Sequence, residues 1–150
     1  SGVFFGMRPV TRSLAITALL SAACATADAP LALDLKPRLD TPFTLEIGQS
    51  AVLTEPAVTI SFTPGPQDRR CPAAAVCGWA GDAVVALPLH VGPPEGDGPD
   101  VEAELHAHRE PRSTPWGVYY ELRLLELRPV PLLDPPSVAA YRATLVMESR

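Results

Sequence analysis

Apolar and polar residues alternate at every second position along most of this chain after residue 40. Successive side chains of a β-strand point to opposite faces, so this period is typical of strands with one buried face. No segment has a helical period sustained over three turns. The sequence therefore predicts β-strands over 43–47, 58–63, 83–89, 101–107, 118–124 and 141–147.

Proline clusters separate these runs. The chain has 18 prolines among 150 residues, well above the average share of about 5%. Proline is excluded from central strands and favours turns, as in TPGPQD, GPPEGDGPD, REPRSTPWG and PVPLLDPP. Short strands joined by such turns favour an all-β fold, an antiparallel β-sandwich (Ig-like or related) of about seven strands over residues 41–150. A short helix is expected over residues 136–140, capped by Asp134.

The alternation changes phase at Leu124-Leu125, so that Leu125 and Leu127 are expected on the opposite face from Leu124. A β-bulge or a strand that crosses between sheets produces such a change, because one extra residue reverses the direction of every later side chain. A strand buried on both faces is the alternative. The sequence leaves these possibilities open.

Residues 7–23 have the layout of a signal peptide. Arg8 and Arg12 precede the apolar segment Leu14–Ala23, and small residues follow it. The apolar segment is shorter than the roughly 20 residues that a permanent membrane-spanning helix needs. We therefore expect export, and interpret residues 1–6 as a cloning remnant or a wrongly assigned start.

The segment LLSAAC resembles a bacterial lipobox, in which Cys24 is acylated and becomes the first residue of the mature protein. Ser21 stands where the lipobox pattern has leucine. Cleavage after Ala25 or Ala27, with free secretion, is the alternative. Lipidation and free secretion both predict an exported protein of the bacterial cell envelope, located in the periplasm or on the outer surface. Residues 24–40 are then a flexible tether, and a lipid at Cys24 makes the membrane a partner.

Cys71 and Cys77 lie in the segment DRRCPAAAVCGWAG, residues 68–81. Structural zinc sites usually pair cysteines more closely and need a second pair, and redox catalysis usually uses Cys-x-x-Cys. A disulfide is the remaining interpretation, and disulfides persist in oxidising compartments. Closing so short a loop contributes about 2 kcal/mol. Trp79 is expected to pack beside this bridge.

The same segment resembles the motif D-x-R-C-P-x4-C-x-W-x-G of a largely uncharacterised family of exported bacterial proteins, often lipoproteins. The resemblance spans Phe43 to Glu148 and includes the flanking strands VTISF and DAVVAL. Arg69 replaces the serine that is usual in the family. The resemblance implies an exported all-β domain and brings no activity with it.

Two groups of residues are candidates for a site. His106 and His108 lie two positions apart, and together with carboxylates they have the ligand chemistry for copper or zinc. A solvated polar strand face is the alternative for this pair. The second group is a candidate binding surface or, alternatively, a local ion-pair set. It consists of Asp68, Arg69, Arg70 and Trp79.

The net charge of −5 disfavours nucleic acid as a partner, because phosphate binding needs a basic surface. The sequence contains no Gly-x-Ser-x-Gly, His-Glu-x-x-His or phosphate-binding glycine loop, so we expect neither an enzyme nor a cofactor. The expected function is a non-enzymatic binding or structural module for an unknown envelope protein or ligand. One alternative is copper or zinc binding through His106 and His108. The other is a protease-inhibitor-like module that presents the Cys71–Cys77 loop.

Overall fold

The computed structural model describes residue 2 and residues 34–150. The predicted signal peptide, Cys24 and the first part of the predicted tether therefore lie outside the described residues. Among the helices of the described part, none is long and apolar enough to cross a membrane.

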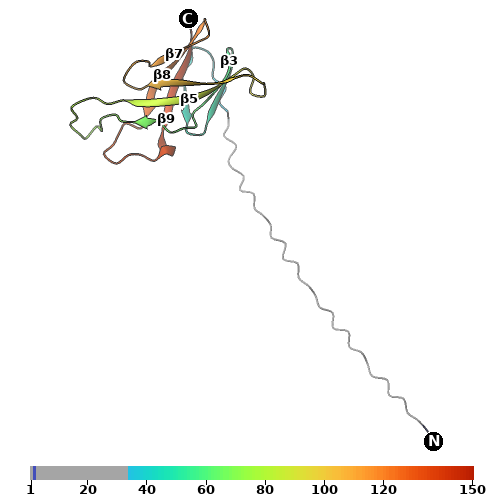
Figure 1. The fold of residues 1–150 in the computed structure, drawn as a ribbon, viewed down its shortest axis with the longest axis horizontal. Coiled ribbons are helices and arrows are strands. Elements are labelled where there is room, and N and C mark those ends of the chain that lie inside the picture. Colours follow the sequence, from blue (N-terminus) through green and yellow to red (C-terminus); the bar gives the residue numbers. More distant parts are fainter. Residues whose placement is uncertain (1, 3–33) are drawn as a thin grey trace. The chain divides into compact units, whose positions relative to one another are not determined.

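The described residues form two antiparallel sheets (Figure 1). The first sheet has the order β1-β9-β8-β7, and the second contains β2-β3-β5-β4 with β6 on the free edge of β5. The long strand β5 runs across the view in Figure 1, whereas β8 and β9 run down it. The strands are β1 (Phe43–Glu46), β2 (Ser50–Thr54), β3 (Ala57–Ser61), β4 (Gln67–Asp68), β5 (Ala83–Val91), β6 (Asp100–His106), β7 (Ser113–Trp116), β8 (Tyr120–Arg128) and β9 (Arg142–Ser149).

A single apolar core fills the space between the two sheets. Alternate residues of β5, and of most of the other long strands, face it, which confirms the all-β sandwich that the alternation predicts. The burial of these side chains is the main stabilising contribution to the fold. The largest fully buried ones include Leu45, Ile60, Phe62, Leu87, Leu105, Leu122, Leu145 and Met147.

The sandwich has nine strands in the described part rather than about seven. Three strands, β2, β4 and β7, are missing from the sequence prediction. β4 has two residues, and β2 contributes only Ala51 and Leu53 to the core. β7 includes Pro115 from a cluster that reads as a turn. This strand is at the edge of its sheet, where a residue without an N–H is tolerated.

A β-bulge in β8 explains the change of phase in the alternation. Leu124 pairs with Leu145 and Glu126 with Thr144, so Leu125 is an extra residue on its strand. After the bulge, Leu127 points back into the core, where it is 4% exposed, whereas Leu125 is 37% exposed. The prediction that these two leucines share a face is therefore wrong, as is the alternative of a strand buried on both faces.

Residues 34–40 belong to the sandwich, although the sequence suggests a tether up to residue 40. Leu35 forms an isolated parallel bridge with Ala51 of β2. The Asp40 carboxylate accepts hydrogen bonds from the backbone N–H and the hydroxyl of Ser149, at 2.8 and 3.0 Å. Leu35 and Leu39 also pack against the core. The burial of these leucines fixes the segment on the domain.

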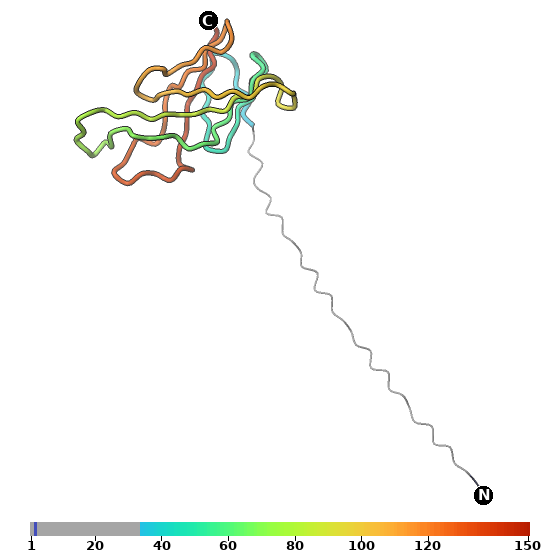
Figure 2. Tube along the Cα trace, in the orientation of Figure 1, coloured from blue at the N-terminus to red at the C-terminus, as the bar shows by residue number. Residues whose placement is uncertain are grey.

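The connection between β8 and β9 lies beside the disulfide-bonded loop. Figure 2 shows both segments on the left side of the domain, and the Ala73 N–H donates a 3.1 Å hydrogen bond to the Pro131 carbonyl. The expected short helix is reduced to one 3-10 turn, Val138–Ala140, with Ser137 rather than Asp134 at its N-cap. The two connections form one end of the sandwich.

The bulge predicts different costs for two neighbouring leucines. Leu127→Ala should lower the free energy of unfolding by about 2–5 kcal/mol, because it leaves a cavity in the core. Leu125→Ala should lower it by less than about 1 kcal/mol, because this side chain is partly exposed. Urea unfolding followed by circular dichroism measures both values. Equal costs for the two variants would contradict the bulge.

Candidate functional site

Cys71 and Cys77 form a disulfide, with their Cα atoms 6.0 Å apart. Within the loop that it closes, the Ala75 N–H donates to the Pro72 carbonyl at 2.9 Å and makes a tight turn. The predicted short-range bridge is therefore confirmed. The two cysteines flank a small loop between β4 and β5.

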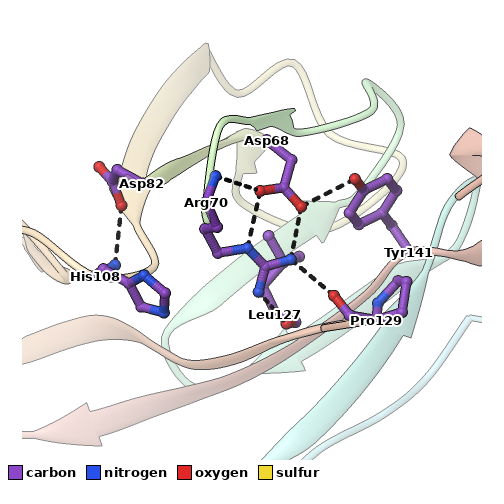
Figure 3. Close-up of polar contacts among 7 residues, drawn as sticks. All are labelled: Asp68, Arg70, Asp82, His108, Leu127, Pro129 and Tyr141. Carbon is purple, nitrogen blue, oxygen red and sulfur yellow. Dashed lines mark hydrogen bonds and ion pairs between the residues drawn. The ribbon is translucent and has the colours of Figure 1, made fainter. Parts of the chain in front are cut away.

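Arg70 lies next to this disulfide. Among the described residues it is the only charged one that is buried, with 8% of its surface exposed. Its guanidinium forks onto the Asp68 carboxylate, with Nε at 2.9 Å from Oδ1 and Nη2 at 2.7 Å from Oδ2 (Figure 3). Nη1 and Nη2 also donate to the carbonyls of Leu127 and Pro129, each at 2.8 Å. We call this group, with the Tyr141 side chain, the Arg70 clamp. It joins the start of the cysteine loop to the end of β8.

Asp68 is held as a carboxylate by the clamp. Burial alone would raise its pKa, but the hydrogen bonds and charge of Arg70 outweigh that effect. The Tyr141 hydroxyl donates a further bond to Asp68 Oδ2 at 3.0 Å. The pKa of Asp68 therefore lies below its ordinary value of 3.8. Burial and the neighbouring carboxylate in turn raise the pKa of Tyr141.

The strand period divides the predicted binding surface in two. Asp68 pairs with the buried Ala83, and Asp68 and Arg70 turn inward to the clamp. Gln67 and Arg69 alternate with them and turn to the outer face of the second sheet. The ion-pair interpretation therefore holds for Asp68 and Arg70, whereas Arg69 remains exposed.

Arg69 lines a shallow hollow on that outer face, with a volume of about 290 Å³. We call it the Trp79 hollow. Trp79 is 74% exposed, so the expectation that it packs beside the disulfide is wrong. The lining residues are Gln67, Arg69, Trp79, Gly81, Asp82, Val84, His106 and Arg109.

Gly81 makes the floor of the Trp79 hollow possible. Its φ is +68°, and a Cβ at this position would lie 2.0 Å from the carbonyl oxygen of Arg69. Only glycine allows both the conformation and the close approach. The loop can therefore return against the strand that carries Arg69, where the Arg69 N–H donates to the Asp82 carbonyl at 2.8 Å.

The structure places His106 and His108 in different surroundings. His106 Nδ1 lies 2.5 Å from Asp82 Oδ2, and its Nε2 is 3.6 Å from Glu104 Oε1. His108 follows the end of β6 and lines another hollow, beside Arg112. Its backbone N–H, not its ring, reaches Asp82 (Figure 3). Among the described residues, no group of three or more His, Cys, Asp or Glu side chains is arranged to hold a metal ion.

Asp82 is the one carboxylate that lines the Trp79 hollow. Burial would raise its pKa, but hydrogen bonds from His106 and from the backbone of His108 and Ala83 lower it. Asp82 is thus a carboxylate whose two oxygens already have hydrogen-bond partners, at 2.5 and 2.9 Å.

A second hollow, of about 220 Å³, lies over the clamp. Its rim is apolar: Leu132 is 59% exposed and Leu133 is 68% exposed. We call it the Leu133 hollow. It shares no lining residue with the Trp79 hollow. The lining residues are Asp68, Arg70, Pro72, Pro131, Leu132, Leu133, Pro135, Pro136 and Tyr141.

Sequence reasoning missed the residues that join the Arg70 clamp and the Trp79 hollow from distant parts of the chain. Tyr141 and the carbonyls of Leu127 and Pro129 complete the clamp from far along the chain. Arg109 joins Arg69 and Trp79 from the loop after β6. No local pattern marks Arg109. Tyr141 alternates in the sequence with polar residues, in phase with the core residues of its strand. That pattern predicts that it is buried but does not predict its hydrogen bond to Asp68.

Comparison of the chain with family models, with curated proteins and with solved structures gives no match.

The clamp predicts a pH-dependent stability. Asp68→Asn should lower the free energy of unfolding at pH 7 by on the order of 3 kcal/mol, because it leaves a buried guanidinium without its counter-charge. The pKa of Asp68 is lowered by folding, so its contribution is fully present above the unfolded pKa, about 3.9, and is lost as the pH falls through the lower folded pKa. The difference between the two proteins should therefore shrink below about pH 4 in urea titrations.

A matched control for this variant is Glu46→Gln. Glu46 pairs with Arg142 on the surface, where both side chains are about half exposed, at 49% and 53%. Its loss should cost less than about 1 kcal/mol. Asp68→Asn with a cost no larger than that of Glu46→Gln would show that the clamp does not stabilise the fold.

Proposed function

We propose that this protein is an exported bacterial envelope protein, anchored by lipid at Cys24, whose β-sandwich is a non-enzymatic binding module. The binding end is the one that carries the disulfide-bonded loop and the β8–β9 connection. The partner is another envelope protein or ligand that contacts these loops.

Three observations support export. The leader has a basic start, a short apolar segment and small residues after it. The Cys71–Cys77 disulfide suits an oxidising compartment. The motif around these cysteines resembles that of exported bacterial proteins, often lipoproteins.

The Arg70 clamp is the observation that carries the binding role. It fixes the cysteine loop to the carbonyls of Leu127 and Pro129, at the start of the next connection. Loops held in one conformation lose less entropy when they bind, so affinity is gained without extra contacts. These loops also expose aliphatic side chains, including Val76 and Leu133. Binding residues are commonly placed on loops of a rigid β-scaffold in this way.

The two alternative functions receive less support. His106 is engaged with Asp82 and Glu104, while His108 lines a separate hollow, so the two rings do not form a shared metal site. A protease binds an inhibitory loop in an extended conformation, whereas Pro72–Ala75 is a hydrogen-bonded turn. Neither alternative has a structural observation in its favour.

Mass spectrometry of the protein from its native host tests the export and the anchor. We expect a mature chain that begins at Cys24, carries acyl groups and has Cys71 and Cys77 oxidised. Cys24→Ser should remove the acyl mass and release the protein from membranes. A mature chain that retains residues 7–23, or one with reduced cysteines, would contradict the proposal.

Site-specific photocrosslinking in the native host tests the binding end. A photoreactive residue at Leu133 should give a discrete adduct, because this exposed side chain lies on the clamped loops. Asp97 is a matched exposed position in the turn at the other end of β5, and it should give none. Adducts of equal yield at both positions, or none at Leu133, would refute a dedicated binding end.

A further inference from the structure

The Trp79 hollow brings together side chains from three strands and two loops. Gln67, Val84 and His106 are cross-strand neighbours on β4, β5 and β6. Arg69 directly follows β4, Trp79 lies just after Cys77 in the β4–β5 connection, and Arg109 comes from the loop after β6. The hollow is therefore formed by the sheet together with the β4–β5 connection and the loop after β6.

Two arginines line this hollow without forming an ion pair among the described residues. Arg69 and Arg109 are exposed, and among the described residues neither forms an ion pair with a carboxylate. The one carboxylate among the lining residues, Asp82, is hydrogen-bonded to His106 and to the His108 N–H, and the two arginines give the lining an excess of positive charge. Arginine binds carboxylate or phosphate with its planar fork, so these two side chains favour an anionic ligand.

Trp79 adds an apolar face to these charges. At 74% exposure, most of its indole is accessible to a ligand. It is the only Phe, Tyr or Trp side chain that lines the hollow, and Gln67 adds amide hydrogen-bond groups to the lining. An aromatic ligand is better held in a slot between two apolar walls. A sugar needs one aromatic face for its C–H groups and polar neighbours for its hydroxyls.

We propose that the Trp79 hollow binds an acidic sugar, a pyranose ring that carries one carboxylate or phosphate. The ring lies on Trp79, and the acidic group is held by Arg69 and Arg109. Gly81 lets the β4–β5 connection pack directly against the backbone that carries Arg69, because any side chain there would collide with the Arg69 carbonyl. This assignment names a ligand class for the binding end proposed above, and it rests on that proposal.

Titration of the full chain with trigalacturonic acid tests the assignment. The protein has 2 tryptophans, so the indole N–H signals of ¹⁵N-labelled protein follow Trp79 separately from Trp116. We expect saturable shifts of the Trp79 signal that weaken with added salt, since the contact is partly ionic. Maltotriose, which is neutral, should cause no such shifts.

Variants locate the contact. Trp79→Ala and Arg69→Gln should each weaken binding by at least about tenfold, because Trp79 is the apolar face and Arg69 is one of the two arginines that hold the acidic group. Arg142→Gln removes an exposed arginine elsewhere, on β9, and should change the affinity by less than about twofold. Equal losses in all three variants would overturn the placement of the ligand.

Further ligands identify the source of the acid. Stronger binding of glucose 6-phosphate than of galacturonate supports a phosphosugar, and the reverse order supports a uronate. Acetate that binds as well as either sugar would overturn the role of Trp79. Absence of any shift at about 10 mM ligand, a concentration well above a millimolar dissociation constant, would overturn the site. Photocrosslinked adducts at Leu133 would still support the proposed binding end in that case, because the two hollows share no lining residue.

Discussion

The buried guanidinium of Arg70 is the interaction on which the arrangement of the loops depends. A charge at this depth is tolerated only when it is paired and hydrogen-bonded, and four donor contacts to Asp68, Leu127 and Pro129 meet that requirement. The contacts cannot form unless both connections adopt their observed paths. A charge that would be costly alone therefore selects one conformation of this end of the sandwich.

The clamp and the disulfide act over different ranges. The disulfide joins residues only six apart, so it stiffens its own small loop. The clamp links residues 57 and 59 positions apart and draws two connections together. The Leu133 hollow and the Trp79 hollow then lie on the two sides of one short segment, because Asp68 and Arg70 face inward while Gln67 and Arg69 face outward. A single alternating segment thus serves stability on one face and a candidate site on the other.

The fold was predictable because side-chain alternation is a local signal with a direct physical cause. It located the long strands and most of the core residues and turns. Val101 and Val118, which alternate with polar residues in the sequence, are nevertheless exposed, and part of one expected turn is strand β7. The alternation failed where a strand was too short to alternate, as in β4, and where one extra residue at Leu125 returned Leu127 to the core. Trp79 is expected to pack beside the disulfide, as large aromatic residues often do in β-sandwiches, yet it is exposed, because its loop lies outside both sheets. Whether a loop residue is buried depends on the path of its loop, and the alternation of apolar and polar residues carries no information about that path.

The sequence alone determined that this chain builds two antiparallel sheets, where most of their strands lie and which cysteines pair. Each of these follows from the chemistry of residues close together in the chain. Only the tertiary structure decided which of the neighbouring residues 68–70 are buried and which are exposed, and which distant residues complete each hollow. Tyr141 reaches Asp68 across 73 positions, and Arg109 reaches the Trp79 hollow from another strand end. Such contacts depend on how sheets and loops pack in space, and no local sequence pattern specifies that packing.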